Sequence, residues 1–94
     1  MRIEFLPIAE KELEEAFEFY KALTSDLAST FMVEVSAALS QIEMLPKSGV
    51  LVGKAKTRRF LIKNFPFALF YRIDTDIIII LSIGHVRRRP RKWS

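Results

Sequence analysis

Apolar residues in the first half of the chain recur at intervals of three and four, which is the period of a helix with one buried face. The first such stretch begins at Pro7, because the first residue of a helix needs no amide hydrogen. The second begins after a capping cluster at residues 24–26 and ends at Pro46. The short connection between them predicts a helical hairpin. The apolar positions are Ala9, Leu13, Ala16, Phe17, Tyr20 and Leu23 in the first helix and Leu27, Phe31, Val35, Ala38, Leu39, Ile42 and Leu45 in the second.

The second half of the chain has the shorter period of extended strands, and a first strand is also expected before the helices. Links of three residues join the later strands, and links this short connect antiparallel neighbours. The sequence therefore predicts an α+β domain of order β-α-α-β-β-β, with the two-helix hairpin packed on one face of an antiparallel sheet and the first strand at an edge. The predicted strands are residues 3–5, 57–63, 67–73 and 77–85.

The last predicted strand is apolar at nearly every position, as expected of an interior strand that is covered on both faces. Successive side chains of a strand point to opposite faces. Strict alternation therefore predicts that Leu81, Ile83 and His85 share one face, whereas Ser82 and Gly84 lie on the other.

The chain has 94 residues, half of them hydrophobic, which is enough for one domain over residues 1–94 with its own core. It has no cysteine, which excludes disulfide bonds and thiolate sites and makes the cytoplasm the expected compartment. Its apolar runs are too short for a membrane span, so no membrane partner is expected. One histidine and three glycines make neither a transition-metal site nor a phosphate-binding loop. We therefore expect no metal and no cofactor.

Charges of the two signs are segregated along the chain. Residues 1–53 contain four Lys and Arg against nine Asp and Glu, a net charge of −5. Residues 54–94 contain eleven against two, a net charge of +9. This division predicts an acidic face and a basic face, and a field that attracts an anionic partner to the basic one.

The end of the chain combines the only histidine, a run of cations and the only tryptophan, a composition typical of proteins that bind polyanions. Arginines on the preceding strands converge with this run if the meander forms, because alternate positions of adjacent strands share a face. Arg58 and Arg59 must point oppositely, so only one of them joins a given cluster. Guanidinium groups bind phosphates and carboxylates equally well. The candidate residues for binding a target or a nucleic acid are Arg58, Arg59, Arg72, Arg87, Arg88, Arg89 and Trp93.

His85 has two interpretations. Imidazole titrates near neutral pH, so His85 is a candidate base for the attack of a ribose 2′-hydroxyl on the adjacent phosphate. Arg59, Arg72 and Arg87 would then stabilise the phosphoryl transition state. Alternatively, a lone histidine at a strand end shapes the backbone or a binding surface, since the sequence offers no second acid or base beside it.

Short motifs along the whole chain resemble the RelE/ParE superfamily, the toxins of bacterial type II toxin–antitoxin (plasmid stabilisation) systems. The motifs are Pro7-Ile8-Ala9, Phe19-Tyr20, Leu27-Ala28, Ile42-Glu43-Met44-Leu45-Pro46, Arg58-Arg59-Phe60, Phe65-Pro66-Phe67, Tyr71-Arg72-Ile73 and His85-Val86-Arg87-Arg88-Arg89-Pro90 before Trp93. The resemblance implies a compact toxin that a cognate antitoxin neutralises by wrapping its C-terminal segment around it.

This superfamily contains two activities. ParE-like members are DNA gyrase inhibitors, whereas RelE-like members are mRNA interferases that act on the ribosome, often with a tyrosine or histidine near the C-terminus. The present chain has no tyrosine after Tyr71, and its spacing of His85, Arg87 and Trp93 is more similar to the ParE side. The resemblance therefore implies a gyrase inhibitor with no catalysis of its own. The alternative is a ribosome-dependent mRNA endoribonuclease with His85 and Arg87 as catalytic residues.

Overall fold

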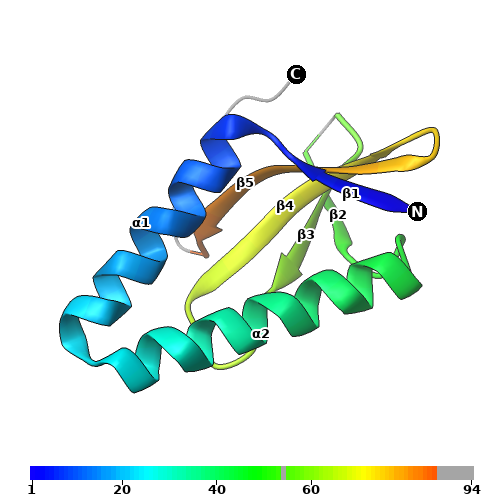
Figure 1. Cartoon of the computed structure of the whole chain (residues 1–94). Coiled ribbons are helices and arrows are strands. Elements are labelled where there is room, and N and C mark those ends of the chain that lie inside the picture. Colours follow the sequence, from blue (N-terminus) through cyan, green and yellow to red (C-terminus); the bar gives the residue numbers. More distant parts are fainter. Residues whose placement is uncertain (54, 87–94) are drawn as a thin grey trace.

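The computed structural model describes residues 1–53 and 55–86. Within them lie a first strand, two helices and four further strands (Figure 1). These elements are β1 (Arg2–Phe5), α1 (Pro7–Leu23), α2 (Ser25–Met44), β2 (Val50–Val52), β3 (Thr57–Leu61), β4 (Phe67–Asp74) and β5 (Ile77–His85).

The strands form one sheet in the order β1-β5-β4-β3-β2. Strands β2 to β5 make an antiparallel meander, while β1 lies at one edge and pairs with β5 in parallel. The predicted α+β class, element order and edge position of the first strand are confirmed. The sheet is mixed rather than wholly antiparallel. Strand β2 runs opposite to β1, and three reversals of direction along the meander bring β5 back to the direction of β1. The sequence prediction also omitted β2, a strand of only three residues.

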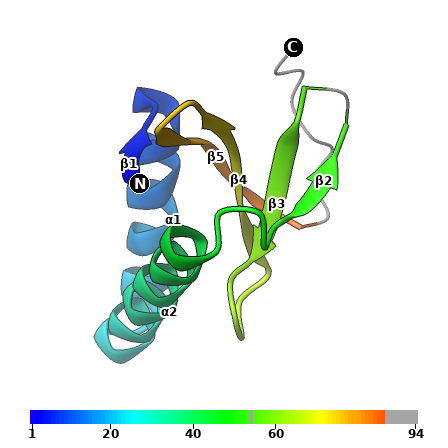
Figure 2. The same ribbon diagram turned by 90° about the vertical axis from the view of Figure 1, so that its right-hand side faces the viewer.

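Both helices cover the same face of the sheet, as the side view shows (Figure 2). Thr24 alone separates them: its amide donates to the Tyr20 carbonyl at the end of α1, and its hydroxyl accepts from the Leu27 amide at 3.0 Å at the start of α2. This capping explains why the hairpin connection is so short. The core between helices and sheet includes the fully buried side chains of Phe31, Ile42, Ile62, Leu69, Tyr71, Ile78 and Ile80.

A β-bulge interrupts the alternation of β5. On β4, Tyr71 pairs with Ile80, whereas the preceding residue Phe70 pairs with Ser82, so Leu81 is an extra residue in β5. An extra residue in one strand shifts the faces of all residues beyond it. The sequence alone gave no sign of this bulge.

Because of the bulge, the predicted grouping of Leu81, Ile83 and His85 is wrong. Ile83 pairs with Leu69 and His85 pairs with Phe67, and these partners face the helices. Ile83 and His85 therefore lie on the helix-covered face, while Leu81 lies on the opposite face. The change matters for function, because it decides which side of the sheet carries the histidine.

Candidate target-binding surface

Two arginines lie on the sheet face that points away from the helices. Arg59 on β3 pairs with Phe70 on β4, and Arg72 follows Phe70 by two positions, so all three side chains share this face. Tyr71, between Phe70 and Arg72, points to the helices instead. Both arginines are partly buried. Two guanidinium groups beside an aromatic ring can bind phosphate or carboxylate groups of a partner.

Arg58 lies on the other face and takes part in a turn of the chain. Its Nη1 donates hydrogen bonds to the carbonyls of Lys47 at 3.0 Å and Gly49 at 2.8 Å. As expected from the sequence, Arg58 and Arg59 thus point oppositely. The hydrogen bonds of Arg58 hold the connection between α2 and β2, and its part in target binding stays a prediction.

Tyr71 holds the same connection from inside the core. Its hydroxyl donates to the Pro46 carbonyl at 2.7 Å and accepts from the Gly49 amide at 2.9 Å. A Cβ atom at Gly49 would lie 2.6 Å from the Tyr71 oxygen, so only glycine fits there. Sequence reasoning treated Tyr71 only as part of a family motif. The hydroxyl of a buried tyrosine usually has a hydrogen-bond partner. This general rule was the one signal in the sequence that could have indicated a structural role for Tyr71.

His85 packs edge-on against Phe67, with ring centroids 5.7 Å apart, and is partly exposed at the end of β5. Its side chain leaves the sheet on the helix-covered face, whereas Arg59 and Arg72 leave it on the opposite face. The structure therefore does not bring His85 together with these two arginines. The other predicted site residues lie outside the described residues; they are Arg87, Arg88, Arg89 and Trp93.

Glu12 is a buried carboxylate on α1. It is 6% exposed, and its Oε1 accepts hydrogen bonds from the Ser82 hydroxyl at 2.9 Å and the Ile83 amide at 3.1 Å. Strand β1 ends at Phe5, so beyond that point α1 rather than a strand covers the edge of β5. Glu12 satisfies the β5 amide exposed there, at the bulge. It thus ties α1 to the strand that carries His85.

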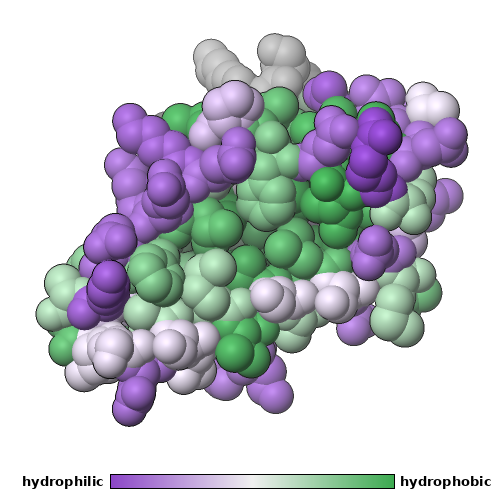
Figure 3. Space-filling view, in the orientation of Figure 1, coloured by the Kyte–Doolittle hydropathy of each residue, from purple (hydrophilic) through white to green (hydrophobic). Residues whose placement is uncertain are grey.

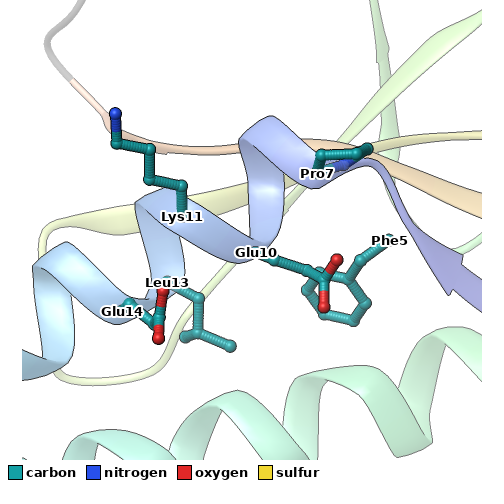
Figure 4. A pocket seen from close by; sticks show the side chains of 6 residues that line it. All are labelled: Phe5, Pro7, Glu10, Lys11, Leu13 and Glu14. Atoms are coloured by element: carbon teal, nitrogen blue, oxygen red, sulfur yellow. The ribbon is translucent and has the colours of Figure 1, made fainter.

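The surface between the helices is apolar with an acidic border. Figure 3 shows a hydrophobic hollow between α1 and α2, with hydrophilic side chains along α1. A pocket at its α1 side contains Phe5 and Leu13, and the carboxylates of Glu10 and Glu14 lie beside them, while Lys11 points away (Figure 4). This side of the molecule can accommodate apolar side chains of a partner.

The described residues offer no group of three or more histidine, aspartate and glutamate side chains that could hold a metal ion. Among the same residues, no helix is long and apolar enough to cross a membrane.

The family described as "ParE toxin of type II toxin-antitoxin system, parDE" matches residues 3–90. The chain belongs to this ParE toxin family. Among curated proteins, none matches the chain.

A solved structure supports the ParE fold. The chain resembles "Chromosomal ParDE TA system from P. aeruginosa" with a TM-score of 0.73 and 19% sequence identity, over 90% of this chain and 95% of that one. At this identity the similarity concerns the fold alone. Together with the family match, it confirms the predicted resemblance and its closeness to the ParE side.

Membership of the ParE family implies a protein partner for this chain. The family is the toxin part of a type II toxin–antitoxin system, so this ParE-family chain has an antitoxin partner. The arginine-bearing face of the sheet and the apolar hollow between the helices are two distinct surfaces on opposite sides of the molecule.

Proposed function

We propose that this ParE-family toxin arrests growth by binding DNA gyrase and performs no catalysis of its own. The proposal rests on family membership and on one observation: His85 and the pair Arg59 and Arg72 leave the sheet on opposite faces. The endoribonuclease alternative needs the histidine as base and those arginines on the same phosphate. A binding surface has no such requirement.

Arg59 and Arg72 are the described residues that we assign to target recognition. They are two cations on the face away from the helices, and Phe70 lies beside both on that face. Their guanidinium groups suit phosphates of gyrase-bound DNA or carboxylates of gyrase itself. The basic run from Arg87 to Lys92 would add long-range attraction to either partner.

The antitoxin is proposed to neutralise the toxin in the cytoplasm, where its target also acts. Type II antitoxins are proteins, and this chain offers such a partner an exposed apolar surface between its helices. An antitoxin that covers this surface removes apolar area from water, which is favourable in itself. Plasmid stabilisation is the biological role that this arrangement would serve.

The direct test measures DNA supercoiling by purified gyrase, with the purified toxin added and ribosomes absent. We expect inhibition of supercoiling or accumulation of cleaved DNA, and relief of either effect by the antitoxin. Translating ribosomes with mRNA are assayed in parallel. No effect on gyrase at saturating toxin, together with mRNA cleavage that is lost in His85→Ala, would establish the endoribonuclease instead.

A further inference from the structure

Strand β1 forms one edge of the sheet of described strands. Strand β1 is last in the strand order and pairs only with β5 among the described strands. The amide of Leu6, just after β1, donates to the Ile80 carbonyl of β5. Because backbone groups of successive residues point to alternate edges, those of Ile3 and Phe5 point outward. The outer edge of β1 therefore offers backbone donors and acceptors to another strand.

The side chains of β1 have a symmetric charge pattern about Ile3. Arg2 precedes it and Glu4 follows it, and the two form an exposed ion pair within the strand, with Nε to Oε2 at 2.8 Å. Their pairing with Ile77 and Ile79 places them on the sheet face away from the helices. An exposed pair of this kind adds little stability to the single chain, since water screens it. Both groups are thus available to other partners.

We propose that a second copy of this chain pairs with the outer edge of β1, antiparallel, with the two-fold axis at Ile3. In this register each Arg2 lies opposite Glu4 of the second copy, so the two-fold axis generates two complementary ion pairs. The two Ile3 residues form a hydrogen-bonded pair, and the charged residues occupy the neighbouring non-hydrogen-bonded positions, where side chains lie closer together. The charge pattern of β1 is therefore complementary to itself.

The helix-side face of the same strand supports the pairing. The register places Met1 opposite Phe5 of the second copy, and Ile3 opposite Ile3. Met1 is 47% exposed, and Phe5 is one of the side chains that line the pocket beside α1 (Figure 4). A flexible methionine side chain packs well against an aromatic ring. The dimer would cover apolar side chains on one face and pair charges on the other.

The resulting dimer joins two sheets through their β1 edges and leaves the opposite edge, β2, outside the interface. A contact between two four-residue strands is small, so the dimer is weak and depends on protein concentration. The inference does not depend on gyrase being the target, because it uses only the pattern of β1.

Charge reversal at Arg2 and Glu4 tests this register. In sedimentation equilibrium of the untagged full chain, Arg2→Glu places two like-charge pairs across the axis, and so does Glu4→Arg. We expect either variant to raise the dimer dissociation constant by about tenfold. The double variant restores opposite charges in exchanged positions, and its dissociation constant should return close to the wild-type value.

Two exposed sites away from β1 provide matched controls. Lys63→Glu changes the net charge as Arg2→Glu does, and Glu18→Arg changes it as Glu4→Arg does; both should leave dimerisation unchanged.

In mixed isotope-labelled samples, an NOE between the α-hydrogens of Arg2 and Glu4 of different copies should identify the register. A chain that stays monomeric at all concentrations overturns the proposal. So does a dimer that is indifferent to the single reversals, or a double variant that is not restored.

Discussion

Single side chains hold the connections of this small domain in place. Tyr71 and Arg58 together donate or accept four hydrogen bonds at residues 46–49, between α2 and β2. Gly49 is required there, since any Cβ would collide with the phenol. None of these roles follows from a hydropathy pattern, because each depends on which residues meet across the fold.

Tyr71→Phe should lower the free energy of unfolding by about 1–3 kcal/mol, because it leaves the Pro46 carbonyl and the Gly49 amide without their hydrogen-bond partner. Urea denaturation measures the change. Tyr20→Phe removes the same atom from another buried ring, whose hydroxyl has no hydrogen bond among the described residues, and is expected to have a much smaller effect at neutral pH. Equal effects of the two substitutions would contradict the role assigned to Tyr71.

Tyr20 should make stability depend on pH in the alkaline range. Its ring packs against Phe31, Phe65 and Phe67, and burial raises the pKa of Tyr20 above its ordinary value. The folded chain then binds the phenolic proton more tightly than the unfolded chain does. The corresponding stability is complete below about pH 10 and is lost as the pH rises through the folded pKa.

The measurement compares the wild type with Tyr20→Phe in denaturant between about pH 9 and pH 11. The free energy of unfolding of the wild type should fall more steeply over this range, since only the wild type carries the Tyr20 phenol. Parallel curves for the two proteins would show that Tyr20 titrates alike in the folded and unfolded states.

At the scale of elements, the sequence predicted the helices and the order of strands well. Both helices have a clear apolar period, and Pro7 and Pro46 mark their outer ends. Two features could not be predicted. Strand β2 is too short to show a period, and the β5 bulge depends on pairing with β4 and on Glu12 from α1. The bulge in turn decided the face of His85, so the error in the predicted faces of β5 came from one extra residue.

The hairpin connection offers a test of its own. Thr24→Ala removes the hydroxyl that caps α2 and should destabilise the chain by about 1 kcal/mol. Ser25→Ala changes the neighbouring hydroxyl, which lies within the first turn of α2, and is the matched control. Thermal unfolding of the two variants checks the difference. If Ser25→Ala destabilises as much as Thr24→Ala, the capping role of Thr24 is wrong.

At the scale of the whole molecule, the two faces of the sheet carry different kinds of side chain. The helices and the apolar hollow lie on one side, and Arg59 and Arg72 lie on the other. The sequence predicted an acidic face and a basic face. Glu10 and Glu14 border the helical side, but Glu4 lies on the arginine-bearing face and Arg58 on the helical side, so the described charges separate only in part. We assign the arginine-bearing face to the target and the helical side to the antitoxin, so substitution of the arginines should leave antitoxin binding unchanged.

The most direct measurement of this account is the toxin concentration that halves gyrase supercoiling, for the wild type and for Arg59→Ala/Arg72→Ala. We predict inhibition by the wild type, and a rise of about tenfold or more in that concentration for the double variant, since two charge-assisted contacts are lost. Lys63 is an exposed cation between β3 and β4, and Lys63→Ala should inhibit like the wild type. The double variant and Lys63→Ala should both bind the antitoxin as the wild type does. Undiminished inhibition by the double variant, or no inhibition by the wild type, would contradict the account.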